Sequence, residues 1–335
     1  MGLKDLFKSK VAKGKLDPRI RWFGKLPSYS DYYSSQADEE WAVEFNDWVL
    51  KGFELYRNRM ANDGKRGVPL PISGGIVRLP KSGMTVFASV LDFGGDMRGR
   101  PFPICFYAGV PTALWPGPTS DRLAGAYRVI RELVALRREI PRFLNSPGRF
   151  EATFGNRQVD LAGIDPNSSD ESWQATAKSI ALADWFGAAK AGMKEASWST
   201  WLRLATAFGE NVAKHESEAF APTFRFPLAM RFSIDAQVSG WLRWLEARMD
   251  IKRRALSLVV TGEAGDAAGS MAIVARDVVP DDFLLATPLA SSLSYVDDLC
   301  RATAGEGEEG AVVAGNGEDA LGTWVDFAQD LVRVP

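Results

Sequence analysis

Apolar residues recur at steps of three and four after a short acidic run, which predicts an amphipathic helix over residues 38–57. The acidic run, Asp38-Glu39-Glu40, falls in the first turn, where the helix dipole favours negative charge. The apolar positions are Trp41, Phe45, Trp48, Val49, Phe53 and Tyr56. We therefore expect this helix to bury a mainly aromatic face.

Three runs rich in β-branched and aromatic residues follow this helix. They are GGIVRL at 74–79, MTVFASVLDF at 84–93 and PFPICFYAGV at 101–110. Turn-forming residues separate them, at Lys81-Ser82-Gly83 and at Gly94-Gly95. This spacing predicts consecutive strands that pair as an antiparallel meander.

The second half of the chain alternates helical and strand patterns. Thr119-Ser120-Asp121 is expected to cap a helix that continues through Val134 and is ended by Pro141. Further helices are predicted over 172–186, 197–209 and 239–249, and strands over 224–230, 255–262 and 270–278. This order favours an α/β fold with one sheet built from both ends of the chain. We expect a single layered α/β sandwich whose mixed, largely antiparallel sheet is covered by helices.

The two ends of the chain differ from this body and from each other. Residues 1–20 form a basic arm with Lys4, Lys8, Lys10, Lys13 and Lys15, and with Leu3, Leu6, Phe7 and Val11 near helical spacing. The arm is either a solvated tail or a contact for anionic lipid or an acidic partner. Residues 301–320 are expected to form a flexible acidic Gly-rich linker, and 321–335 a C-terminal helix. The predicted α/β domain spans 21–300.

Composition limits the function classes. The 335 residues include 46% hydrophobic residues, and 40 Lys and Arg against 42 Asp and Glu give a net charge of −2, which offers no overall attraction for nucleic acid. No apolar run is long enough to span a bilayer, and no secretory leader is recognisable. The two cysteines cannot build a disulfide framework, which favours the reducing cytoplasm.

Known catalytic and cofactor-binding motifs are missing from the sequence. His215 is the single histidine, Cys105 lies in a predicted apolar strand, and Cys300 follows two aspartates that disfavour a thiolate. The eleven tryptophans mostly have aliphatic neighbours at helical spacing, which favours core positions over a stacking platform for nucleic acid. Carboxylate pairs such as Asp92 with Asp96, or Asp281 with Asp282, are a weak signal for acid–base chemistry. We expect no metal and no cofactor.

Two segments contain residue types that packing alone does not explain. The first is WFGKLPSYSDY at 22–32, and the second is DFGGDMRGRPFP at 92–103. Asp31 of the first and Arg100 of the second are candidate partners. Each segment is either a turn locked by an Asp–Arg pair or part of a binding surface.

Together these segments resemble the TagF/ImpM family of type VI secretion accessory proteins. The family signature G-K-L-P-S-x-G-D-F is similar to the residues from Gly24 to Tyr32, with Ser30 in place of the usual glycine. A second signature, S-x-D-x-x-G-R-x-F-P, is similar to Ser89 followed by Gly99 to Pro103, and its aspartate is either Asp92 or Asp96. The helix motif around Asn46-Asp47-Trp48-Val49 and the late strands extend the resemblance over about residues 20–300.

The resemblance implies an α/β layered fold and a cytoplasmic, non-enzymatic regulator. Members of the family repress the secretion apparatus after translation by engaging a forkhead-associated scaffold protein, so the expected partner is such a scaffold. The candidate partner-binding residues, expected on one exposed patch, are Lys25, Pro27, Asp31, Arg98 and Arg100. The alternatives are a structural component of the assembly that associates through the helix 38–57, or an enzyme that uses Asp31 or Asp92.

Overall fold

The computed structural model describes residues 18–35, 38–64, 70–115, 117–120, 122–143, 146–161, 164, 172–189, 205, 208, 212, 223–249, 255–262 and 268–299. Most of the predicted basic arm, the linker 301–320 and the helix 321–335 lie outside the described residues. The same is true of His215, Cys300 and most of the predicted helix 197–209.

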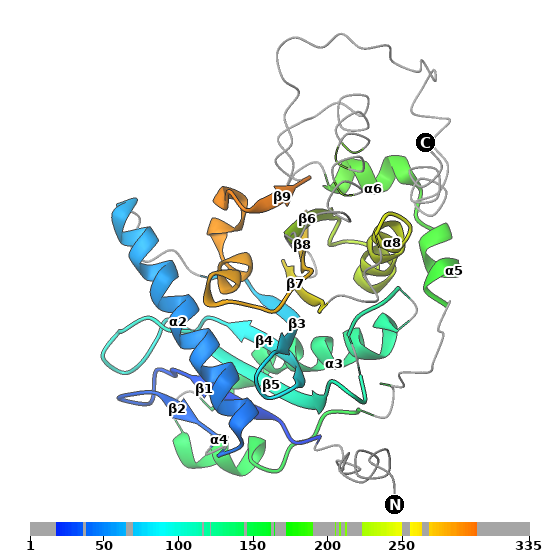
Figure 1. Ribbon diagram of the computed structural model, residues 1–335. Helices are drawn as coiled ribbons and strands as arrows, with labels where there is room; N and C mark the ends of the chain where they lie inside the picture. The colour runs from blue at the N-terminus through cyan, green and yellow to red at the C-terminus, as the bar shows by residue number, and fades with distance from the viewer. Residues whose placement is uncertain are drawn as a thin grey trace, which may run out of the picture.

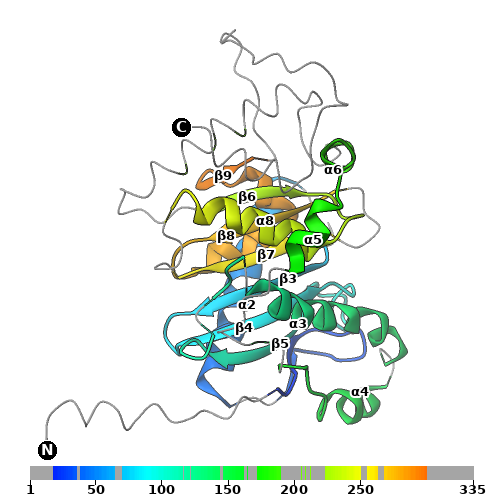
Figure 2. The same cartoon turned by 90° about the vertical axis from the view of Figure 1, so that its right-hand side faces the viewer.

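The described residues form a nine-stranded sheet in the order β2-β1-β5-β4-β3-β7-β8-β6-β9 (Figures 1 and 2). The strands are β1 Arg21–Gly24, β2 Tyr33–Ser34, β3 Ser73–Leu79, β4 Met84–Leu91, β5 Ile104–Pro111, β6 Thr223–Leu228, β7 Ser257–Thr261, β8 Gly269–Val274 and β9 Val296–Asp298. Every neighbouring pair is antiparallel except β6 and β9, which are parallel. The predicted fold class, a mixed and largely antiparallel sheet covered by helices, is confirmed.

The two halves of the chain meet in the middle of this sheet. Strands β3, β4 and β5 form the predicted antiparallel meander. Strand β7 then pairs with the free side of β3, from Ser73 opposite Thr261 to Ile76 opposite Leu258. One sheet is therefore built from both ends of the chain, as the order of the patterns predicted.

Helix α2, Glu40–Asn62, covers one face of the sheet together with the 3₁₀ helices η5 (Pro280–Ala286) and η6 (Pro288–Ser292) (Figure 1). Its aromatic face is buried as predicted, and Phe53 contacts both Phe102 and Phe283. Burial of a phenylalanine contributes about 1.5–3 kcal/mol to folding. Because this aromatic face packs against the chain's own sheet, it is not exposed for contact with another copy of the chain.

The opposite face packs against α3 (Leu123–Ala135), α4 (Pro147–Phe154), α5 (Ser172–Lys178), α6 (Leu182–Ala189) and α8 (Ile234–Glu246), several of which face the viewer in Figure 2. Alternation along β5 divides the two cores, since Cys105 and Tyr107 pack on the α2 side while Phe106 and Ala108 pack on the other. Every described tryptophan except the partly exposed Trp41 is buried, which confirms core positions for them.

Two local predictions were wrong. Helix α3 begins at Leu123 with Arg122 as its N-cap, and Ser120 instead donates to the carboxylate of Glu246, 126 positions away. Local spacing cannot reveal such a distant acceptor. The helix predicted over 172–186 is two helices, α5 and α6, with a break after Lys178. After α3, the short 3₁₀ helices η1 (Leu136–Arg138) and η2 (Ile140–Arg142) follow, and Pro141 lies within η2.

Candidate functional site

The two signature segments are loops that leave the same end of neighbouring strands. Gly24 at the end of β1 pairs with Ile104 at the start of β5, so the beginning of the β1–β2 loop lies beside the end of the β4–β5 loop. The backbone of Gly24 has φ +150°, and a Cβ there would lie 2.1 Å from the carbonyl oxygen of Pro103. Only glycine allows this approach. The next residue, Lys25, donates its main-chain N–H to the same Pro103 oxygen at 3.3 Å.

Asp96 is the centre of the contact between the loops. Its side chain is fully buried, and its Oδ1 accepts main-chain N–H groups of Arg98 at 2.9 Å and Arg100 at 3.0 Å. Its Oδ2 accepts Nε of Arg100 at 2.7 Å and lies 3.2 Å from Nζ of Lys25. Gly95, at φ +99°, makes this tight turn possible, because a Cβ there would lie 2.2 Å from the Arg100 oxygen. A buried carboxylate is thus satisfied by four donors.

These donors determine the charge of Asp96. Burial alone raises the pKa of its carboxyl group, but hydrogen bonds from the main chain and guanidinium of Arg100 oppose that effect. The Lys25 ammonium and the Arg98 amide add to them, so the pKa lies well below its ordinary value. Asp96 is therefore an ionised acceptor and a poor proton donor.

Lys25 is enclosed within the site. Its side chain is 6% exposed and lies between the Asp96 carboxylate and the ring of Tyr32, with Nζ 4.7 Å from the ring centroid. The expectation that Lys25 belongs to an exposed patch was wrong, because ion pairing with a buried carboxylate draws the ammonium inside. Lys25 can support a binding surface from below but does not offer its charge to solvent.

Arg100 connects the buried pair to the surface. Its Nη2 donates to the main-chain oxygen of Ser30 and lies 3.7 Å from Oδ1 of Asp31. The main-chain N–H of Met97 adds a second link between the loops, donating to Tyr29 at 2.8 Å. The predicted Asp31–Arg100 pairing is confirmed as a loose contact, since the Asp31 side chain is 72% exposed. Asp96, and not Asp92, is the principal carboxylate partner of Arg100.

The buried contacts of Asp96 and Lys25 form a base beneath an exposed surface. We call this surface the rim, and it consists of Tyr32, Met97, Arg98 and Arg100, with Asp31 at its edge. Met97 is 65% and Tyr32 44% exposed. The Tyr32 ring stacks on Phe23 and meets Phe102 edge-on, so its orientation is fixed. Pro27 is only half-buried beside it. Sequence reasoning missed Met97 and Tyr32 as candidates, although a methionine and a tyrosine among the glycine and charged residues of the two segments were a usable signal.

The carboxylates considered for acid–base chemistry have structural contacts. Asp92 accepts the main-chain N–H groups of Leu70 and Gly94, at 3.1 and 2.8 Å. Asp282 is buried and bound by both terminal nitrogens of Arg276. Asp281 lies 3.7 Å from Arg59 near the surface. Among the described residues, no group of three or more His, Cys, Asp or Glu side chains is placed to hold a metal ion. Burial raises the pKa of the Cys105 thiol.

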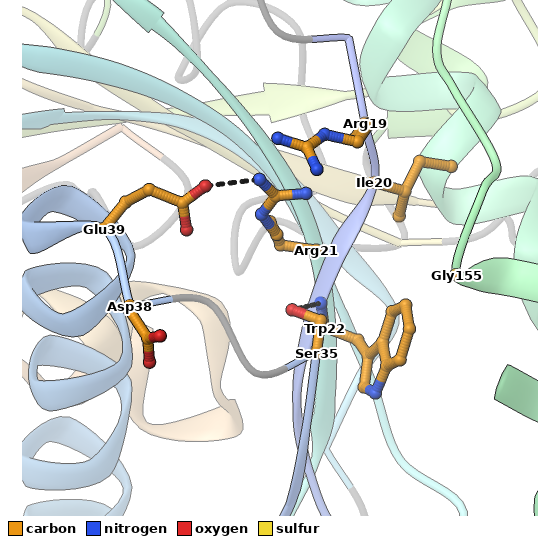
Figure 3. Close-up of a pocket in the computed structure, with 8 residues that line it drawn as sticks. All are labelled: Arg19, Ile20, Arg21, Trp22, Ser35, Asp38, Glu39 and Gly155. Atoms are coloured by element: carbon orange, nitrogen blue, oxygen red, sulfur yellow. Dashed lines mark hydrogen bonds and ion pairs between the residues drawn. The ribbon is translucent and has the colours of Figure 1, made fainter.

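Two surface hollows lie away from the signature loops. One, of about 480 Å³, lies beside β1 and is lined by Arg19, Arg21, Asp38 and Glu39 among others (Figure 3). The other, of about 320 Å³, lies along α2. Neither is lined by Asp31 or Asp92, so the acids proposed for an enzymatic cleft do not converge in these hollows.

Comparison with known protein families shows that residues 21–140 match a domain family associated with the type VI secretion system. The family is that of the TagF N-terminal domain, and the matched residues contain both signature loops and α2. The resemblance read from the sequence is therefore confirmed for residues 21–140, which form a type VI secretion-associated domain.

Other comparisons add little. No curated protein matches the chain. The crystal structure of PA0076 from Pseudomonas aeruginosa PAO1 is similar at 16% identity and a TM-score of 0.33, over 42% of this chain and 63% of that one. The chain thus spans less than two thirds of that protein's length. Among the described helices, none has the length and apolar character needed to cross a membrane.

Proposed function

We propose that this chain is a non-enzymatic, cytoplasmic accessory protein of the type VI secretion system that represses the apparatus by binding a forkhead-associated scaffold. The TagF N-terminal domain supports the association with secretion. The observation that carries the proposal is the rim, an exposed group of Tyr, Met and Arg side chains on a fixed base.

The composition of the rim suits protein recognition. Tyrosine, methionine and arginine are enriched at the centres of protein interfaces. The exposed Arg98 side chain has no hydrogen-bond or ion-pair partner among the described residues, so it is available to a carboxylate of the scaffold. Asp96 and Lys25 contribute indirectly, because they hold the loop in one conformation. A preformed surface loses less conformational entropy on binding.

The remaining candidates have different roles in this proposal. Arg100 contributes its exposed edge while its guanidinium is anchored by Asp96. Asp31 flanks the rim and restrains Arg100, and Pro27 limits the freedom of the first loop. We also propose that residues 21–300 form one structural unit, which the sheet shared between its two halves supports.

The test measures binding of the full chain to the purified scaffold. Met97→Asp and Arg98→Glu each remove one exposed rim group, and we expect each to weaken binding at least tenfold, or about 1.4 kcal/mol. The melting temperature should stay unchanged. Arg128→Glu, an exposed arginine of α3 on the other side of the sheet, is the matched charge control.

Equal affinities for the wild type and both rim variants would exclude the rim as the binding surface. No measurable binding by the wild-type chain would reject the scaffold as partner. A loss shared by Arg128→Glu would indicate general electrostatic attraction rather than a defined site.

A further inference from the structure

A groove of about 320 Å³ follows the outer side of the N-terminal half of α2. Its apolar lining comes from three separate parts of the chain: Val43, Trp48, Leu79, Pro80, Val278 and Pro280. Val43 is 54% exposed, although it lies on the same helix as the buried aromatic residues. The groove therefore leaves apolar surface uncovered on a helix whose opposite, aromatic face is buried in the core.

The charge along this helix is unequal. At the end of the groove near the middle of α2, Lys51 is paired with Asp47 at 2.7 Å. Glu44 accepts main-chain N–H groups of the β3–β4 turn. At the near end Asp38 and Glu40 are exposed carboxylates with no partner among the described residues. The groove is lined by the carboxylates Glu40, Glu44 and Asp47 against Lys51 and Lys81, so its net charge is negative, and Asp38 lies just beyond it in the hollow beside β1.

The chain enters the fold beside this acidic end. Arg21 of β1 binds Glu39, and Figure 3 shows Arg19 and Arg21 on the side of β1 that faces Glu39. The described chain begins at Pro18, which accepts the main-chain N–H of Val159 and lies three residues, or about 10 Å of extended chain, before Arg21. They carry Lys4, Lys8, Lys10, Lys13 and Lys15 against Asp5 and Asp17, and include the apolar residues Leu3, Leu6, Phe7 and Val11.

We propose that residues 1–17 bind along α2 of the same chain. In this arrangement Lys13 and Lys15 lie against Asp38 and Glu40, and Phe7 and Val11 cover Val43 and the apolar floor of the groove. Two properties select this occupant over others, namely its opposite charge and its attachment to β1, whose Arg21 binds Glu39 at the start of α2.

The distances allow this arrangement. Residues 11–17 span up to about 20 Å when extended. The helix rises only about 10 Å from Glu40 to Asp47. Because the charges involved are exposed, the contact should weaken as salt rises above physiological concentration. This inference is independent of the proposed function, since the rim lies on different loops.

The test is site-directed cross-linking in the full chain. Cys300→Ser removes one native thiol, and buried Cys105 does not react. Val11→Cys combined with Val43→Cys, treated with a short bis-maleimide, should give an intramolecular cross-link at least tenfold faster than Val11→Cys combined with Arg128→Cys. Lys13→Glu with Lys15→Glu should reduce that rate toward the control rate.

Three outcomes would overturn the proposal. Equal rates for the two cysteine pairs would show that the arm has no preference for the groove. Cross-links that join isotopically light to heavy chains would assign the groove to the arm of a second copy. Cross-linking at the control rate, combined with co-sedimentation on phosphatidylserine vesicles that depends on Lys13 and Lys15, would assign the arm to a lipid surface.

Discussion

Gly24→Ala should destabilise the protein far more than an alanine at another glycine of the same two loops. The new Cβ would lie 2.1 Å from the Pro103 oxygen and 2.5 Å from Cα of Ile104, and both are backbone atoms of the neighbouring strand. Ordinary contact between a carbon and a carbonyl oxygen begins at about 3.3 Å. The strands must therefore separate by about 1 Å, or the loop must change its course.

The magnitude follows from two costs. An unfavourable φ costs about 1–3 kcal/mol. Forcing an extra methyl group against a packed strand costs about a further 1–3 kcal/mol. We expect the free energy of unfolding to fall by about 2–6 kcal/mol in Gly24→Ala. Gly99→Ala is the matched control, because Gly99 has φ +70° with nothing within 4 Å of its added Cβ. It should cost about 1–2 kcal/mol.

The assay is urea unfolding followed by tryptophan fluorescence and by circular dichroism, with coincident transitions required before free energies are compared. Binding of the scaffold to folded Gly24→Ala, measured well below its transition, should also weaken, because Arg98 is carried on the displaced loop. Unfolding free energies for Gly24→Ala and Gly99→Ala that agree within error would refute the argument that close backbone approach fixes the two loops.

Three further outcomes are expected. Asp96→Asn should clearly lower the melting temperature measured by calorimetry, because Lys25 and Arg100 lose their shared buried anion. Asp31→Asn, at an exposed position, should change the melting temperature little. Equal shifts for the two variants would contradict this prediction. The folded state lowers the pKa of Asp96, so the ionised carboxylate stabilises the fold above the ordinary carboxyl pKa of about 4. This contribution to the free energy of unfolding is lost as pH falls below that value. Melting curves from pH 6 to pH 2 should therefore converge for wild type and Asp96→Asn, and parallel curves would count against the lowered pKa. Removing the partner of buried Asp282 in Arg276→Met should cost about 3 kcal/mol in urea unfolding, and a change below about 1 kcal/mol would show that the carboxylate is solvated instead.

Elements with strong local patterns were predictable from the sequence. The meander, the late strands and the aromatic face of α2 follow from periodicity, because side chains alternate along strands and recur every three to four positions on helices. The two signature loops were predictable as a pair, and so was the approach of Asp31 to Arg100.

What the sequence could not provide depends on distant contacts. A lysine is expected at the surface, and only the closure of one loop over the other places Lys25 beside a buried carboxylate. The choice between Asp92 and Asp96 was open because both precede Arg100, and the turn at Gly95 decides it. Likewise, nothing local to Ser120 indicates that its acceptor is Glu246.

The pairing of β3 with β7 has a consequence for folding during synthesis on the ribosome. The TagF N-terminal domain ends at residue 140, so β3 has no partner on one side when that domain has been made. Its partner β7 is translated roughly 180 residues after β3, on the order of ten to forty seconds at ordinary rates of synthesis. During that interval an apolar strand with free N–H and C=O groups is a template for wrong pairing. Nascent chains stopped before residue 257 should therefore recruit chaperones or aggregate, and those that extend past 261 should not.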